Sequence, residues 1–211
     1  MITRFCFVRH GETDWNVERR IQGQLDIDLN PTGEAQARAL RPNLAGQPFT
    51  AVYSSDLARA WRTAELATHG LGLPAVQGAA ALRERHYGVY QGMTSVDALA
   101  RHPGVHHHHT GRSLDYNYET GETLRAFAAR VMAGVTELVE RHAGGILLGF
   151  THGGVLDILY RAARGRDLSG PRDFPIPNAA LNWLEYEGGR WTLITWADRR
   201  HLEGALDETL Q

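Results

Sequence analysis

The chain has 211 residues, 43% of them hydrophobic and 22% charged, so it is long enough and apolar enough to bury a core as an ordinary globular protein. Its 22 basic and 24 acidic residues nearly cancel, which leaves no surplus of positive charge to bind nucleic acid or an anionic membrane. The single cysteine, Cys6, excludes a disulfide framework, and the absence of lysine excludes Schiff-base catalysis and the Walker-type P-loop.

The first half of the chain alternates short apolar runs with helical patterns. Residues 2–8 predict a buried strand, and this run is too short for a signal peptide or a membrane span. Asn30 and Pro31 form a typical helix start, and we expect this helix to continue to about residue 41. A second strand is predicted at 51–53, followed by a helix over 57–67 that Asp56 can cap.

The second half continues this alternation after one interruption. Residues 93–120 show little periodicity, which predicts an irregular insertion. An apolar stripe predicts a helix over 124–139, residues 145–150 predict a third strand, and a further helix is expected over 155–163. Residues 180–186 and 191–196 are separated by a glycine turn and predict a β-hairpin.

This order of elements predicts an α/β protein with helices on both faces of a mainly parallel sheet. No repeat or linker divides the chain, so we expect a single cytoplasmic domain over residues 1–211. Long irregular insertions in compact domains are commonly lids or binding loops. We therefore expect the insertion around 93–120 to be lid-like and to select the ligand.

Arginine and histidine side chains follow three of the predicted strands. They are Arg9, His10, Arg59 and His152. Because ligands of open α/β sheets bind beyond the carboxyl ends of the strands, we expect all four at one edge of the sheet. No acidic or cysteine side chain stands among them, so we expect no metal ion at this place. Arginine forks bind phosphate oxygens and histidine can donate or attack, so the pattern predicts a phosphate site.

Several motifs, in this order along the chain, resemble the histidine phosphatase superfamily, the phosphoglycerate mutase-like family. They are RHGET with WN at 9–16, SSDLARA with TA at 54–64, LRERHYG with QG at 82–92, THGG at 151–154, PNAA at 177–180, and WAD with HL at 196–202. A histidine–glycine pair after a strand means little alone. The joint pattern covers nearly the whole chain and is specific.

The resemblance implies a three-layer α/β/α fold with a mainly parallel, doubly wound sheet of about six strands, one of them antiparallel. It implies that His10 is the nucleophile that becomes phosphorylated. Arg9, Arg59 and His152 would form the phosphate pocket, with Asn16 as a further donor. The residues that it places on the substrate side are Gln22, Gly23, Tyr87 and Gly153.

Glu84 matches the general acid/base of the family. In that role it must be protonated to give the leaving alkoxide its proton, and then ionised to activate the water that attacks phosphohistidine. Fixed guanidinium groups counter the charge on the phosphoryl oxygens, so the expected reaction uses neither a metal nor a cofactor. Without the resemblance, Glu84 would be interpreted as a solvated loop carboxylate between Arg83 and Arg85.

Three functions are compatible with such a pocket. We favour a metal-independent phosphatase that hydrolyses a small phosphomonoester through a phosphohistidine intermediate. The segment at 84–92 suggests a cofactor-dependent phosphoglycerate mutase instead, but a mutase grips a second anionic group with cationic partners. Here lysine is absent, and Arg101 and Arg112 are the only arginines of the insertion. A non-catalytic binder of phosphorylated ligands is the third function, which the presence of His10 and Glu84 disfavours.

The sequence leaves the substrate open beyond its phosphoryl group. The expected partner is a small phosphorylated metabolite rather than a nucleic acid or a membrane, and the resemblance implies a monomer or a homodimer. The histidine run from His106 to His109 can be interpreted as a metal-binding tract, as a cationic lid, or as an inert flexible loop. Where the family often has GGES, this chain has TGET at 120–123, from which we expect only the start of a helix.

Overall fold

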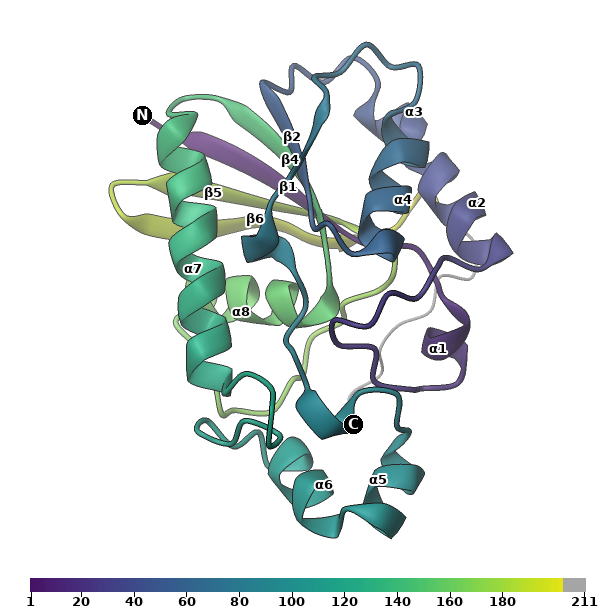
Figure 1. Cartoon of the computed structure of the whole chain (residues 1–211). Coiled ribbons are helices and arrows are strands. Elements are labelled where there is room, and N and C mark those ends of the chain that lie inside the picture. The colour runs from purple at the N-terminus through teal and green to yellow at the C-terminus, as the bar shows by residue number, and fades with distance from the viewer. Residues whose placement is uncertain (203–211) are drawn as a thin grey trace.

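A six-stranded sheet with the order β3-β2-β4-β1-β5-β6 forms the centre of the molecule (Figure 1). The protein is seen here as a computed structural model that describes residues 1–202, so residues 203–211 of the expected domain lie outside the described residues. The strands are β1 (Thr3–Arg9), β2 (Ala51–Ser54), β3 (Val76–Gly78), β4 (Ile146–Thr151), β5 (Leu181–Glu187) and β6 (Arg190–Asp198).

The sheet is mainly parallel, as predicted. β1 pairs in parallel with β4, and β2 pairs in parallel with both β4 and β3. β5 runs antiparallel to its neighbours β1 and β6, and it forms with β6 the predicted hairpin. β3 was not predicted, because it is only three residues long and two of its residues are exposed.

Helices cover both faces of the sheet and give the three layers expected from the sequence (Figure 1). They are α1 (Asp14–Val17), α2 (Pro31–Ala39), α3 (Arg41–Leu44), α4 (Ala58–Thr68), α5 (Ser95–Arg101), α6 (Pro103–Thr110), α7 (Leu124–Arg141) and α8 (Gly153–Arg164), with two short 3-10 turns, η1 (Ala80–Leu82) and η2 (Gly88–Tyr90). Within residues 1–202, no helix is both long enough and apolar enough to cross a bilayer.

The apolar run of β1 explains why both faces need covering. Phe5 and Phe7 are fully buried in the core that α7 and α8 share with the sheet. Cys6 and Val8 are fully buried in a second core, to which α3, α4 and Leu40, the residue between α2 and α3, contribute. Successive side chains of a strand point to opposite faces, so an unbroken apolar run requires a helical layer on each side.

Helix starts show where local sequence signals succeed and fail. Asn30 caps α2 as predicted, since its side chain accepts a hydrogen bond from the Gly33 amide at 2.8 Å. The predicted cap of α4 by Asp56 is wrong: the Ala58 amide instead donates to Asp26 Oδ1 at 2.8 Å. The side chain of Asp56 forms an ion pair with an arginine of a distant segment, which local sequence patterns do not report.

The prediction that the insertion at 93–120 is irregular is wrong, because this segment contains α5 and α6. Thr94 and Asp97 form a reciprocal capping box at the start of α5, and Pro103 is the first residue of α6. The two helices lie apart from the helical layers in Figure 1 and pack over a small core of their own. Its buried members are Tyr90, Ala98, Val105 and Tyr118. Helices of seven and eight residues are too short to show a clear apolar period.

The histidine run is part of α6 and makes contacts within the protein, so the interpretation as a flexible loop is wrong. His106 Nε2 lies 2.9 Å from Ser95 Oγ, and His109 Nδ1 lies 3.0 Å from the hydroxyl of Tyr118. Burial, followed by the charge of Arg85, lowers the pKa of His109 to about 3. His109 is therefore neutral and cannot act in a cationic lid. Within residues 1–202, no three histidine, cysteine or acidic side chains group closely enough to hold a metal ion.

Candidate active site

The hydrogen-bond ladder of the sheet continues past β1 and β4 and sets two histidines side by side. Arg9 is the register partner of Thr151 in these parallel strands. The His10 amide then donates to the Thr151 carbonyl at 2.9 Å. His152 is the next residue of the other chain segment, so the two imidazole rings meet with their centroids 5.2 Å apart. The sheet register therefore fixes the spacing of the pair.

The end of β2 supplies a partner for His152 that was not predicted. The Ser55 hydroxyl lies 2.8 Å from His152 Nε2, and its oxygen already accepts from the Leu57 amide at 3.3 Å. The hydroxyl proton is then free to point at Nε2, which leaves the ring proton on Nδ1. His152 Nδ1 is buried and has no hydrogen-bond partner in the described chain. A buried donor left unpaired is costly, and an anionic ligand would satisfy it.

His10 is held as a neutral imidazole with a defined tautomer. Its Nδ1 lies 2.7 Å from the Gly11 carbonyl, an acceptor, so the ring proton is assigned to Nδ1 and the lone pair to Nε2. Burial, with the charges of Arg59 and Arg9, lowers the pKa of His10 well below its usual value. A neutral imidazole with an available lone pair is a nucleophile.

Two buried arginines stand beside the histidine pair. Arg9 is 2% exposed and Arg59 is 1% exposed. Arg9 donates from Nη1 to the Ile176 carbonyl at 2.6 Å, whereas Arg59 donates to the Leu25 carbonyl at 2.9 Å and to the Gly23 carbonyl at 2.7 Å. Burial lowers the pKa of Arg59 to about 10, although the negative charge of Glu84 acts to raise it. The Arg59 Nε is buried and has no hydrogen-bond partner within residues 1–202, so a bound anion would supply the missing acceptor.

Glu84 lies in the turn between η1 and η2 and contacts the first turn of α8. Its Oε1 accepts from the Arg85 amide at 2.7 Å, and its Oε2 accepts from the Gly154 amide at 2.9 Å. A Cβ atom at position 154 would stand 2.1 Å from Glu84 Oε1, so only glycine leaves room for this carboxylate. Gly153 is buried beside it as the first residue of α8. The carboxylate thus reaches the segment that carries His152.

Comparison with known proteins identifies the family of this site. A model described as the histidine phosphatase superfamily (branch 1) matches residues 5–199. The chain belongs to this superfamily. Phosphoglycerate mutase-like protein 4 of Arabidopsis thaliana is 36% identical to this histidine phosphatase over 199 residues, which are 93% of this chain and 85% of that protein.

Two further relatives agree with this assignment. The metal-independent phosphoserine phosphatase of Arabidopsis thaliana is 33% identical over 95% of this chain and 84% of its own length. The solved structure of Bacillus stearothermophilus YhfR superposes with a TM-score of 0.88 at 32% identity, covering 95% of this chain and 100% of that one. This histidine phosphatase is therefore an enzyme of the phosphomonoesterase type.

Three of the other predicted site residues of this histidine phosphatase support the pocket through contacts within the protein. Asn16 accepts from the Thr13 amide at 3.1 Å and completes the capping box of α1. Gln22 donates to Thr13 Oγ1 at 2.8 Å, and the carbonyl of Gly23 holds Arg59. The predicted contacts of Asn16, Gln22 and Gly23 with substrate stay predictions.

Tyr87 packs among aromatic and cationic groups at the base of α6. The guanidinium carbon of Arg85 lies 5.4 Å from its ring centroid, and the ring of Tyr118 meets it edge-on at 5.3 Å. Burial, with the charge of Glu84, raises the pKa of Tyr87 well above its usual value. Its hydroxyl therefore stays protonated at neutral pH, and its predicted contact with substrate also stays a prediction.

Two residues that sequence reasoning left without a role fix the backbone of the nucleophile loop. Asn178 Nδ2 donates to the His10 carbonyl at 2.9 Å, and Thr63 Oγ1 accepts from the Gly11 amide at 2.9 Å. Both residues belong to the motifs quoted above. Their membership of those motifs was the only signal, because neither contact is local in sequence.

Proposed function

We propose that this histidine phosphatase hydrolyses a small phosphomonoester in two steps, through a phosphohistidine on His10. The observation that carries the proposal is the state of His10. It is a buried, neutral imidazole whose Nδ1 proton is fixed on the Gly11 carbonyl and whose ring lies beside that of His152. Arg9 and Arg59 lower its pKa by their charge, and their buried guanidinium groups would bind the phosphoryl group.

In the first step, Nε2 of His10 attacks phosphorus, an N–P bond forms, and the P–O bond to the leaving group breaks. Glu84 in its protonated form gives the proton to the departing oxygen, so the product leaves as an alcohol. The guanidinium groups bind the three phosphoryl oxygens, over which negative charge spreads in the transition state. The Gly11 carbonyl accepts a stronger hydrogen bond from Nδ1 as the imidazole becomes positively charged.

In the second step, Glu84 acts as a carboxylate and takes a proton from water as the water oxygen attacks phosphorus. The N–P bond breaks, inorganic phosphate leaves, and the neutral imidazole of His10 is restored. The cationic groups serve both steps because the phosphoryl oxygens stay in one place. The arginines supply the charge stabilisation, so the proposed reaction proceeds without a metal or another cofactor.

The proposed substrate is a small phosphorylated metabolite. Phosphoserine is the first candidate, because a relative 33% identical to this chain is named a metal-independent phosphoserine phosphatase. The cytoplasmic location and the monomeric or dimeric state stay predictions from the sequence.

Phosphoglycerate mutase activity is the second candidate, since another relative is named phosphoglycerate mutase-like. The contacts of Arg112 disfavour it. Arg112 Nη2 pairs with Asp157 Oδ2 at 2.6 Å, and its Nε donates to the Leu168 carbonyl at 3.0 Å. This arginine of the insertion therefore binds groups within the protein, which disfavours a role in binding a second anionic group of the substrate.

The test uses the 211-residue chain with p-nitrophenyl phosphate and with phosphoserine, each in the presence of a chelator. We expect release of inorganic phosphate, and we expect His10→Ala to abolish it. An alkaline denaturing quench followed by mass spectrometry should find the phosphoryl group on His10, because the N–P bond is labile to acid. Turnover that survives His10→Ala would overturn the proposal, as would phosphate binding without a phosphoenzyme.

A coupled assay with 3-phosphoglycerate and a catalytic amount of bisphosphoglycerate separates the two activities. Inorganic phosphate as the sole product excludes the mutase. Formation of 2-phosphoglycerate at a rate above that of phosphate release would instead replace the phosphatase by the mutase.

A further inference from the structure

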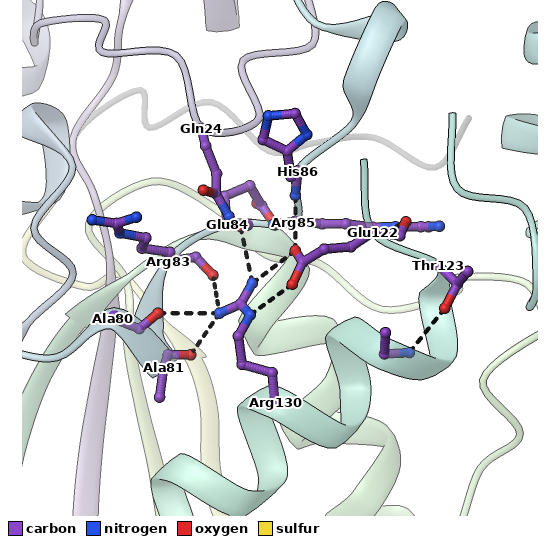
Figure 2. Close-up of polar contacts among 11 residues, drawn as sticks. Gln24, Ala80, Ala81, Arg83, Glu84, Arg85, His86, Glu122, Thr123 and Arg130 are labelled. Carbon is purple, nitrogen blue, oxygen red and sulfur yellow. Dashed lines mark hydrogen bonds and ion pairs between the residues drawn. The ribbon is translucent and has the colours of Figure 1, made fainter. Parts of the chain in front are cut away.

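We propose that Arg130 and Glu122 are positioning residues that hold Glu84 at the place where it transfers protons, an inference that rests on the proposed function. Both residues lie outside the phosphate pocket. Figure 2 shows the guanidinium group of Arg130 at the centre of the turn that carries Glu84, with Glu122 on its other side.

Arg130 donates hydrogen bonds to backbone carbonyl groups of the turn. Its Nη1 donates to the carbonyls of Ala80 at 3.2 Å, Ala81 at 3.1 Å and Arg83 at 3.2 Å, and its Nη2 donates to the Glu84 carbonyl at 3.2 Å (Figure 2). The Ala80 carbonyl also accepts from the Arg83 amide within the 3-10 turn, and the Glu84 carbonyl also accepts from Gln24 Nε2 at 3.0 Å, whereas the carbonyls of Ala81 and Arg83 lie outside any sheet or helix ladder. One planar guanidinium fork therefore sets the path of the chain through Glu84.

Glu122 binds and orients the guanidinium group of Arg130. Its Oε1 lies 2.8 Å from Arg130 Nε, and its Oε2 lies 2.9 Å from Arg130 Nη2 and also accepts from the His86 amide at 2.9 Å. The pair thus fixes the backbone both before and after Glu84. Burial alone would raise the pKa of Glu122, but the hydrogen bonds from Arg130 and the His86 amide more than offset it, and the pKa lies below its usual value. Glu122 is therefore ionised at neutral pH.

The anchor for this arrangement is rigid. Arg130 belongs to α7, an 18-residue helix whose apolar face is buried in the main core. One turn further along α7, a Cβ atom at Gly134 would stand 2.1 Å from Ala81 Cβ, so the helix and the turn are in close contact. Functional groups on rigid elements keep a more exact geometry than groups on loops. Glu84 lies in a loop, but its contact with Arg130 ties it to the rigid helix α7.

The chemistry of the leaving group separates positioning from general structural support. An alkoxide, as in phosphoserine, needs a proton in order to leave, whereas p-nitrophenolate is stable enough to leave without one. Displacing a catalytic group by about 1 Å can cost roughly 100-fold in rate. Displacement of Glu84 should therefore slow the alkyl substrate far more than the aryl substrate. A smaller folded fraction would slow both equally.

The experiment uses the double variant Arg130→Met with Glu122→Gln, which removes both charges and leaves no half-buried charge unpaired. For phosphoserine, or the alkyl phosphate that the wild type hydrolyses best, we expect kcat/KM to fall by about 10-fold to 100-fold. For p-nitrophenyl phosphate we expect a fall of less than about 3-fold, since no proton is needed. Glu84→Gln should produce the same selective loss, and the double variant added to Glu84→Gln should not change the ratio of the two substrates further.

Arg141→Gln is the matched control. Arg141 lies on the same helix and pairs with Glu137, but both side chains are more than half exposed. We expect both substrates to be hydrolysed at wild-type rates by this variant. Equal losses for the two substrates in the Arg130 and Glu122 variant would overturn the inference, as would no loss at all. A wild type without phosphoenzyme would instead overturn the proposed function, so the two failures are distinguishable.

Discussion

His10 and His152 are placed by the backbone ladder of β1 and β4, whereas Glu84 is placed by side chains that reach it from other elements. Each histidine directly follows a strand, and the hydrogen bond from the His10 amide to the Thr151 carbonyl extends the sheet to the pocket. Glu84 follows a three-residue turn and depends on Arg130 for the path of its backbone. We therefore expect the histidine pair to keep its place when a side chain is changed, and we expect Glu84 to shift when its supporting side chains are lost.

This difference predicts two kinds of functional defect. The pocket binds the phosphoryl group that every substrate shares, so damage to it should slow all substrates alike. In the first step, which kcat/KM reports, the acid segment serves only leaving groups that need a proton, so damage to it should make the loss of kcat/KM depend on the substrate. The ratio of kcat/KM for phosphoserine to that for p-nitrophenyl phosphate, the substrate ratio, distinguishes the two defects.

Removing a pocket arginine should have the largest effect. Arg59→Ala takes away one buried guanidinium group, and we expect kcat/KM to fall by about 100-fold to 1,000-fold for both substrates. Steady-state kinetics should show an unchanged substrate ratio. Arg62→Ala, on the same helix but exposed and paired with Glu34, should retain wild-type rates. A loss confined to phosphoserine would instead mean that Arg59 acts together with the acid segment.

Crowding the acid should have the next largest effect. In Gly154→Ala the new Cβ atom would stand 2.1 Å from Glu84 Oε1, so the carboxylate must move. We expect kcat/KM for phosphoserine to fall by roughly 10-fold to 100-fold, with a much smaller change for p-nitrophenyl phosphate. Gly165→Ala is the control at the other end of α8, where φ is +61° and a Cβ meets nothing within 4 Å. It should cost about 1 kcal/mol of stability and leave the substrate ratio unchanged. A wild-type ratio in Gly154→Ala would mean that Glu84 is not the acid.

The same contrast explains what the sequence could predict. The sheet and the histidine pair were predictable because the signals are local: an apolar run, then His10 or His152 at its end. The register of the parallel strands then places the two histidines side by side. The α5 and α6 helices were missed, because short helices that pack on their own small core show no clear period.

The supports of Glu84 were not predictable in this way. Arg130 lies 46 residues after Glu84, in a helix whose apolar stripe says nothing about its polar face. The TGET motif was expected only to start a helix, and Thr123 does cap α7. The role of its neighbour Glu122 depends on the distant turn at 80–86, and no local pattern reports such a contact. Side-chain contacts between distant segments decide the remainder of the site.

The pH dependence of stability should be a moderate effect, and it tests the packing of α6 rather than the phosphate pocket. The pKa of His109 lies at about 3 in the folded protein, against the ordinary value of 6.5. Below about pH 6.5 the unfolded chain therefore binds a proton at this residue that the folded protein does not. The stabilisation is complete above pH 6.5 and is lost as the pH falls toward 3.

His109→Gln removes this linkage while it keeps a group that can hydrogen-bond to Tyr118. We expect the melting temperature of the variant to decline less than that of the wild type between neutral and mildly acidic pH, as measured by differential scanning fluorimetry. His107→Gln changes an exposed histidine of the same helix and should leave the wild-type profile unaltered. Parallel profiles for wild type and His109→Gln would mean that His109 is not held neutral by burial.

The smallest effect is expected from the residue next to Glu84. Arg83 pairs with Asp56 at 2.5 Å, but the two side chains are 39% and 40% exposed. An exposed ion pair contributes at most about 1 kcal/mol, so urea unfolding of Arg83→Gln should show a loss no larger than this. Arg83 contributes to the positioning of Glu84 through its carbonyl, which the substitution keeps. The substrate ratio should therefore stay at the wild-type value. If Arg83→Gln lowered the ratio as far as the Arg130 and Glu122 variant does, the position of Glu84 would depend on any nearby charge rather than on the fork from α7.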